Sequence, residues 1–158
     1  MRLQLVDRIL EIEQGKRILV SKVLSRAEEY LADHFPKRPV MPGVMMLQVC
    51  VEAGMWLLRA GGQAPCGAVL TEVSNIRYGS FFEPGREMIA EVTLLGTDGG
   101  RFKFKAEGRV GEERTIQARM ILEPLAVTAP DGTPLEDVAA KVKASLDERY
   151  ALLAPAIR

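Results

Sequence analysis

The longest apolar stretch of the chain runs from Val44 to Leu58, with only two polar residues near its middle. Apolar residues on nearly every side are typical of a helix buried inside a soluble fold. The preceding Pro42-Gly43 pair suits a helix start, and the later Gly61-Gly62 pair suits its end. Gly54 weakens such a helix by about 1 kcal/mol relative to alanine, which indicates close packing against a neighbouring element.

Strand patterns flank this helix on both sides. Arg8–Glu13 and Arg17–Val23 are separated by Gln14-Gly15-Lys16, which predicts a hairpin. Ser25 begins a capping-box pattern that predicts a short helix over Arg26–Ala32. The order of elements predicts an α+β domain in which one antiparallel sheet packs against the central helix. After that helix, four further strands are predicted over Ala68–Ile76, Arg86–Leu95, Arg101–Val110 and Arg114–Leu122, and apolar and polar residues alternate in the last two.

The C-terminal part gives different signals. Residues 129–134 are rich in turn-forming types and predict a linker. Within it, Thr133 matches an N-cap, with a proline directly after it and a glutamate three positions on. Apolar residues at helical spacing predict an amphipathic helix over Leu135–Leu153. We therefore expect a domain over residues 1–125 and a linker with a helical extension over residues 126–158.

The composition narrows the class of protein. The chain has 158 residues, of which 47% are hydrophobic and 27% charged, and this fits one soluble domain. Lys and Arg together number 21 and balance 21 Asp and Glu, so no excess charge indicates nucleic acid or an anionic membrane as partner. The apolar run is too short to span a bilayer comfortably, and charges within MRLQLVDRILEIEQ argue against a signal peptide. Cys50 and Cys66 are too few for a disulfide framework and lack metal-ligand spacing. We expect a cytoplasmic protein with no metal or redox cofactor.

The segment from Asp33 to Val44 contains the candidate chemistry. It holds the only histidine of the chain, His34, and three prolines that favour a stiff, extended loop. Stiffness is useful beside a histidine because a general base must be held in place before substrate binds. Gly43 opens the predicted helix, so unpaired backbone N–H groups meet there at the positive end of the helix dipole. Such donors can hold a thioester carbonyl and stabilise an enolate-like oxygen.

This segment resembles the active-site segment of the hot-dog-fold 3-hydroxyacyl-[acyl carrier protein] dehydratases of fatty-acid synthesis. The resemblance is in the run His34-Phe35-Pro36-x-Arg38-Pro39-Val40-Met41-Pro42-Gly43-Val44, which a buried helix follows. It implies the hot-dog fold, in which a curved antiparallel sheet wraps a long helix, and it covers roughly Leu5 to Glu123. Further matches to the family's opening hairpin, later strand and Pro-Gly turn are Leu5–Ile9 with Gly15–Arg17, Asn75–Tyr78 and Phe82–Gly85.

The resemblance also implies roles for single residues. His34 falls on the family's catalytic histidine, which acts on the α-proton of the acyl thioester. Gly43 falls on the glycine whose backbone N–H binds the thioester carbonyl. The family's carboxylate on the long helix, contributed by the partner subunit, falls on Gln48. The residues that we expect to bind the substrate are Gly43, Val44, Phe35, Arg77 and Phe82.

Gln48 is a departure from the family. A neutral amide cannot donate and accept a proton as a carboxyl group can. Glu52 lies one helical turn later on the same face, so glutamate and glutamine are exchanged relative to the order expected in the family. Three interpretations are open. Glu52 acts on the hydroxyl group, or the catalytic pair is broken and leaves a thioester-binding subunit, or Glu52 is a buried carboxylate paired with an arginine.

The function implied by the resemblance is dehydration of a (3R)-hydroxyacyl thioester, or the reverse hydration. The acyl group would be attached to acyl carrier protein or to coenzyme A, and Lys37, Arg38 and Arg77 are the cations available to an acidic carrier. The alternative is a non-catalytic or helper subunit that binds acyl thioesters, because Gln48 replaces the glutamate. Since the family builds its sites between subunits, we expect a homodimer or a trimer of dimers, or a heterodimer with an active homologue.

Overall fold

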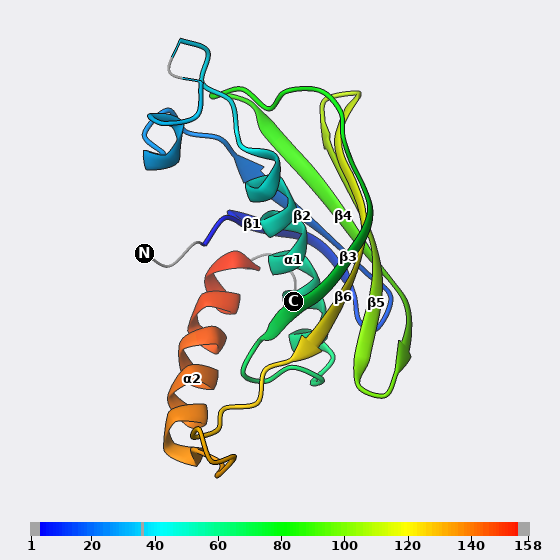
Figure 1. Cartoon of the computed structure of the whole chain (residues 1–158), viewed down its shortest axis with the longest axis vertical. Helices are drawn as coiled ribbons and strands as arrows, with labels where there is room; N and C mark the ends of the chain where they lie inside the picture. Colours follow the sequence, from blue (N-terminus) through cyan, green and yellow to red (C-terminus); the bar gives the residue numbers. More distant parts are fainter. Residues whose placement is uncertain (1–3, 36, 155–158) are drawn as a thin grey trace.

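The computed structural model describes residues 4–35 and 37–154. Residues 1–3, Pro36 of the predicted loop and residues 155–158 of the predicted extension lie outside the described residues. Within the described part, the strands form one antiparallel sheet in the order β1-β2-β4-β5-β6-β3, which curves around α1 (Figure 1). The expected α+β hot-dog architecture is thus confirmed. The elements in chain order are β1 (Arg8–Glu13), β2 (Arg17–Val23), the 3-10 turn η1 (Glu29–Leu31), α1 (Gly43–Ala60), β3 (Ala68–Tyr78), β4 (Glu87–Asp98), β5 (Arg101–Val110), β6 (Glu113–Pro124) and α2 (Glu136–Leu153).

The helix α1 forms the centre of the core. Val49, Ala53 and Leu57 are fully or almost fully buried among the residues of the sheet. Gly54 allows a close approach, because a Cβ at this position would lie 2.7 Å from Leu122 Cδ1 on β6. By length and composition α1 could cross a membrane, but 56% of this stretch is buried inside the protein, as expected for a core helix.

The alternation predicted for the strands is confirmed in β5 and β6. In β5, for example, Phe104 and Ala106 are fully buried, whereas Lys103 and Lys105 point outward. This pattern places one face of the sheet against α1 and leaves the other face to solvent.

The strand β3 forms one edge of the sheet, and β1 forms the other. The strand β3 pairs only with β6, and Val69, Val73 and Tyr78 on it are 39–48% exposed. An edge strand with free backbone groups and exposed apolar side chains is available for pairing with another chain.

The predicted short helix over residues 26–32 is wrong, because only η1 forms there. Ser25 Oγ accepts a hydrogen bond from the N–H of Ala27 at 3.1 Å. The hydroxyl group therefore closes a local turn and does not cap a longer helix.

The predicted N-cap of the second helix is also wrong. Leu135 occupies the N-cap position and makes no side-chain cap. Pro134 instead forms an isolated bridge with Thr128, and the N–H of Thr133 donates to Asp131 Oδ1 at 2.9 Å. The linker is therefore a tight turn that ends directly before α2.

The helix α2 packs against its own domain, on the side of α1 away from the sheet (Figure 1). Arg59, near the end of α1, donates to the carbonyl oxygen of Lys143 at 3.0 Å and to the carboxylate of Asp147. The rings of Trp56 and Tyr150 lie with their centroids 5.9 Å apart. These contacts attach the C-terminal helix to the face of α1 on which Glu52 lies.

Candidate active site

His34 lies in the loop between η1 and α1 and lines a cavity of about 500 Å³. Gly43 and Val44 at the start of α1 and Tyr78 at the end of β3 line the same cavity. The imidazole is half-buried, and its centroid lies 4.5 Å from that of the Phe35 ring, with an angle of 59° between the rings. One cavity therefore contains both the predicted base and the predicted thioester-binding backbone.

The start of α1 leaves backbone donors free at the wall of this cavity. The carbonyl oxygen of Pro42 accepts the first bonds of the helix, from Met45 N–H at 2.9 Å and Met46 N–H at 3.2 Å. The N–H groups of Gly43 and Val44 precede these bonds and have no partner inside the helix. Because the helix dipole adds positive potential at the same end, this site can bind a carbonyl oxygen and stabilise negative charge on it.

Tyr78 covers the start of α1, a contact that the sequence did not indicate. A Cβ on Gly43 would lie 2.7 Å from Cε1 and 2.9 Å from Cζ of the Tyr78 ring. Burial raises the pKa of the Tyr78 hydroxyl, so this group stays protonated at neutral pH. Glycine is therefore required at position 43 by the ring of Tyr78 as well as by the exposed backbone.

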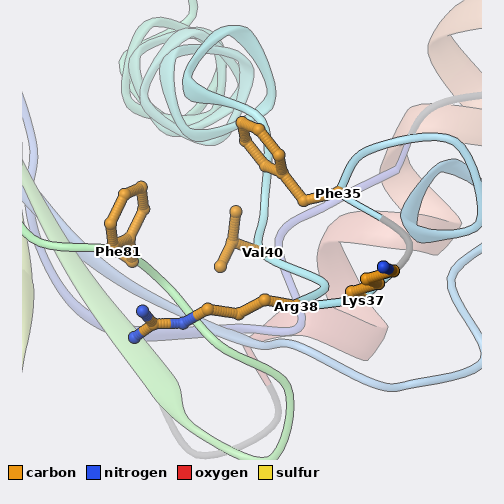
Figure 2. Close-up of a pocket in the computed structure, with 5 residues that line it drawn as sticks. All are labelled: Phe35, Lys37, Arg38, Val40 and Phe81. Atoms are coloured by element: carbon orange, nitrogen blue, oxygen red, sulfur yellow. The ribbon is translucent and has the colours of Figure 1, made fainter.

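A second apolar cavity of about 500 Å³ adjoins the first and shares Val40 and Phe81 with it. The rings of Phe35 and Phe81 flank Val40 (Figure 2), and they are 57% and 60% exposed. Phe35 has a backbone φ of +54°, which a bulky residue rarely adopts. Arg38 lies 5.5 Å from the centre of the Phe81 ring and donates to Glu83 Oε1 from Nε at 3.1 Å and Nη2 at 2.9 Å. The two cavities together form an apolar region beside His34 with Arg38 at its margin.

Phe82 and Arg77 lie away from the two loop cavities. The Phe82 side chain is fully buried in the core, and its carbonyl oxygen accepts the N–H of Met41 at 2.8 Å, which fixes the loop before α1. Arg77 faces a separate surface depression that it shares with Lys105 and Arg119. The expected substrate-binding residues that line the loop cavities are Phe35, Gly43 and Val44.

Gln48 and Glu52 line a different cavity, of about 330 Å³, between α1 and α2. Gln48 is half-buried there, and His34 lines the loop cavity instead. Within one chain, the predicted base and the residue at the position of the family's carboxylate thus face separate spaces.

Glu52 binds the N-terminal segment of its own chain. Its side chain is buried, and its Oε2 accepts the N–H groups of Leu5 at 2.8 Å and Val6 at 3.1 Å. Burial raises the pKa of this carboxyl group, while the two backbone donors and the charge of Arg149 oppose that rise. Arg149 Nη2 donates to the carbonyl oxygen of Val6 at 3.2 Å. The third interpretation paired Glu52 with an arginine, whereas its direct partners here are two backbone N–H groups, with Arg149 close enough to affect its pKa.

Two other kinds of chemistry have no support in this region. Cys50 is fully buried, and burial raises the pKa of its thiol to about 12, so it is not a nucleophile at neutral pH. Among the residues that the structure describes, no group of three or more His, Cys, Asp or Glu side chains is placed to hold a metal ion.

The chain has relatives among known proteins. A family model described as a FabA-like domain matches residues 1–119 and ends before α2 begins. The chain is 40% identical over 121 residues to the 3-hydroxyacyl-[acyl-carrier-protein] dehydratase FabZ of a Polaromonas species, covering 74% of this chain and 83% of the relative. It is 34% identical over 131 residues to the protein of the same name from Verminephrobacter eiseniae, covering 80% and 87%. Among solved structures, the dehydratase heterocomplex ApeI:P from Xenorhabdus doucetiae shares the fold, with a TM-score of 0.64 at 14% identity over 82% of this chain and 86% of that one.

Proposed function

We propose, because this chain belongs to the FabA-like family, that it is a (3R)-hydroxyacyl-thioester dehydratase that also catalyses the reverse hydration. The observation that carries the proposal is the cavity shared by His34 and the free N–H groups at the start of α1. A base and an oxyanion-binding backbone in one apolar space are what elimination from a thioester requires. The relatives named 3-hydroxyacyl-[acyl-carrier-protein] dehydratases support the same reaction and a place in fatty-acid synthesis.

In the proposed reaction the proton passes through His34. The imidazole removes the α-proton, and the electron pair of the C–H bond moves onto the thioester carbonyl oxygen, which the N–H of Gly43 stabilises as an enolate. Collapse of the enolate forms the double bond between the α- and β-carbons and breaks the bond from the β-carbon to oxygen. The imidazolium returns its proton to the departing oxygen, so the products are a 2-enoyl thioester and water.

Gln48 then has an orienting role in this proposal. Its amide can hydrogen-bond the β-hydroxyl group but cannot supply or remove the proton. Glu52 does not replace the missing carboxyl group, because its Oε2 is engaged by Leu5 and Val6. The return of the proton from His34 removes the need for a second acid.

We propose that the enzyme is a homodimer joined through the β3 edges. His34 and Gln48 line separate cavities of one chain, so a site with both residues needs a second copy. The edge of β3 and its exposed Val69 and Val73 support pairing there, since a second β3 would extend the sheet. A heterodimer with a homologous subunit would use the same edge, and a trimer of dimers would need a further contact between dimers.

We further propose that the acyl group arrives on acyl carrier protein, the carrier named for the relatives, and that the reaction takes place in the cytoplasm. Lys37 and Arg38 line the loop cavity that adjoins the one beside His34. Their charges lie where an acidic carrier would approach the apolar space beside His34. Coenzyme A, with its phosphate groups, is the alternative carrier.

A non-catalytic subunit that binds thioesters is the second candidate function. The observation in its favour is that Gln48 has no carboxyl group and that Oε2 of Glu52 is bonded to the backbone of Leu5 and Val6. It predicts the same fold and the same binding of thioesters, without turnover. Only a measurement of turnover separates it from the dehydratase.

The deciding experiment measures the loss of enoyl-thioester absorbance after the purified protein is mixed with crotonyl-coenzyme A or with a crotonyl carrier protein. We expect turnover that His34→Ala lowers by about a hundredfold or more, because a general base contributes on that order. Gln48→Ala should lower it by about tenfold, the value of one hydrogen bond of about 1.4 kcal/mol. Gln14→Ala, in the exposed β1–β2 turn, is the matched control. Tight thioester binding with no turnover by the unaltered protein would establish the non-catalytic subunit.

A further inference from the structure

The hydroxyl group of Tyr78 is a polar group of the loop cavity that the proposed reaction leaves without a role. Three side chains with hydrogen-bonding groups line this cavity, namely His34, Tyr78 and Ser80. Within residues 4–35 and 37–154, no group forms a hydrogen bond with the Tyr78 hydroxyl. The cavity therefore contains a donor for which the described part of the fold supplies no acceptor.

The ring of Tyr78 lies against the residue proposed to bind the thioester carbonyl. A Cβ on Gly43 would stand 2.9 Å from Cζ, which is the ring atom that carries the hydroxyl group. The hydroxyl oxygen is thus one covalent bond away from an atom in contact with Gly43. A thioester oxygen that binds the N–H of Gly43 would lie beside the phenol as well.

The backbone that follows Tyr78 is fixed to the neighbouring strand. The N–H of Gly79 donates to the carbonyl oxygen of Thr115 at 2.9 Å. The N–H of Ser80 donates to the carbonyl oxygen of Arg114 at 3.1 Å. The ring is therefore held between β6 and the start of α1, and a donor fixed in this way before the reaction costs no reorganisation during it.

The phenol is suited to donate to an oxygen that becomes negative. Burial raises its pKa, so it keeps its proton at neutral pH and can donate a hydrogen bond. Hydrogen bonds to a charged oxygen are roughly twice as strong as those to a neutral one. A bond from Tyr78 would therefore strengthen as a thioester carbonyl becomes an enolate, and an interaction that strengthens in the transition state raises kcat.

We infer that the hydroxyl group of Tyr78 is a second donor to the thioester oxygen, beside the N–H of Gly43, which makes Tyr78 a catalytic residue. His34 removes the α-proton, and the electron pair of the C–H bond moves onto the thioester oxygen. Tyr78 keeps its own proton throughout and only hydrogen-bonds the negative oxygen, so the products are unchanged. The inference rests on the proposed function and adds a side chain to its oxyanion site.

Tyr78→Phe is the variant that tests the inference. It keeps the ring against Gly43 and removes only the hydroxyl group. Loss of one donor to an oxyanion lowers kcat by about a hundredfold or more, so we expect a fall of this size with crotonyl-coenzyme A. KM should change by less than about threefold, because the bond contributes mainly in the transition state.

Infrared spectroscopy of a bound thioester gives a readout that a merely structural role would not move. The probe is butyryl-coenzyme A with a ¹³C label at the thioester carbonyl, which has no double bond to hydrate and no hydroxyl group to eliminate. A hydrogen bond to a carbonyl oxygen lowers its stretching frequency. The frequency of the bound probe should therefore be higher in Tyr78→Phe than in the unaltered protein. Binding of the probe also shows that the variant is folded.

Tyr150→Phe is the matched control, because it makes the same chemical change on α2. Tyr150 is half-buried and lines neither loop cavity. Its variant should leave both kcat and the carbonyl frequency unchanged. If Tyr78→Phe keeps kcat within about twofold, the inference is overturned and the proposed function stands. A large fall in kcat without any change in the carbonyl frequency also overturns it, because the phenol would then act elsewhere.

The infrared measurement separates failure of the inference from failure of the proposed function. If the unaltered protein binds thioesters without turnover, the proposed function fails and the carbonyl frequency alone decides the inference. A higher frequency in Tyr78→Phe then supports the phenol as a donor to the bound thioester. Equal frequencies in the two proteins overturn it.

Discussion

The phenol ring of Tyr78 lies so close to the backbone of Gly43 that a Cβ there would stand 2.7 Å from its Cε1 atom. This contact joins the end of β3, at the edge of the sheet, to the first residue of α1. The sheet edge proposed for dimer formation and the backbone proposed to bind the thioester carbonyl are thus in direct contact. Pairing at one can set the geometry of the other.

Gly43→Ala should lower kcat/KM by about tenfold, because the new methyl group displaces either the Tyr78 ring or the N–H, at a cost of about 1–3 kcal/mol. Tyr78→Ala removes the obstacle. In the Tyr78→Ala background, adding Gly43→Ala should therefore lower kcat/KM much less than it does in the unaltered protein. Kinetics on the four proteins of this cycle provide the measurement. If the effects of the two substitutions on kcat/KM simply add, the contact with Tyr78 is not the cause of the loss in Gly43→Ala.

Gly54→Ala should destabilise the fold although alanine is the better helix former. The added Cβ would lie 2.7 Å from Leu122 Cδ1, and such overpacking costs about 1–3 kcal/mol, against a gain of about 1 kcal/mol in helix propensity. Urea unfolding should show a net loss of about 1 kcal/mol. Gly96→Ala is the control, because no atom lies within 4 Å of the Cβ that it would add, and it should change stability by less than about 0.5 kcal/mol.

The free energy of unfolding of the unaltered protein, minus that of the Glu52→Gln variant, should fall as pH rises above about 4.5. Burial raises the folded-state pKa of Glu52 above the ordinary value of 4.5, so its favourable contribution is complete below that pH and is lost as pH rises through the folded pKa. Glutamine keeps an oxygen acceptor for Leu5 and Val6 but does not titrate. Urea unfolding of both proteins across this pH range checks the sign, and a difference that grows with pH would contradict it.

Mixtures of His34→Ala and Gln48→Ala should regain activity if the site lies between subunits. A mixed dimer places both substitutions in one site and leaves the other intact, so random exchange restores about a quarter of the original activity. The assay is the crotonyl-thioester measurement after subunits have been exchanged in mild denaturant. Activity equal to the mean of the two parents would place the whole site within one chain.

Cys66 should react with iodoacetamide long before Cys50 in the folded protein. Cys66 is half-buried next to α2, where its Sγ lies 3.7 Å from the carbonyl oxygen of Ala139. Cys50 is buried with a thiol pKa of about 12, so raising the pH from 7 to 9 still leaves it protonated. Mass spectrometry of the Cys66→Ser variant isolates Cys50, and rapid labelling there would show that α1 opens locally.

The sheet and α1 were predictable from sequence because their signals are local. Alternation in β5 indicates a strand with one buried face, and the apolar run of α1 indicates a helix inside the core. The predicted ranges agree with the structure to within a few residues. His34 and Gly43 were placed in one site by a motif that spans a single loop. The two wrong helix starts came from Ser25 and Thr133, where a side chain or the backbone satisfies a turn in place of a cap.

The contacts that the sequence could not reveal are long-range. Glu52 bonds to Leu5 across 47 positions, and nothing in a helical pattern indicates which distant N–H a buried carboxylate will meet. The contact of Tyr78 with Gly43 depends on where β3 ends in the folded sheet. The structure shows that His34 and Gln48 face separate cavities. A predicted helix does not indicate which other elements pack against each of its faces.

The bond from Arg149 to Val6 spans 143 positions of the chain, and both residues lie beside the carboxylate of Glu52. On the ribosome the N-terminal segment and α1 emerge early, whereas Arg149 emerges only after all six described strands have been made. A nascent chain can therefore assemble its sheet around α1 while the charge of Glu52 still lacks its nearby cation. Docking of α2 brings Arg149 to Glu52 and Val6. Chains released from the ribosome before Arg149 is made would therefore have a loosely held N-terminal segment and be the first targets of cellular proteases.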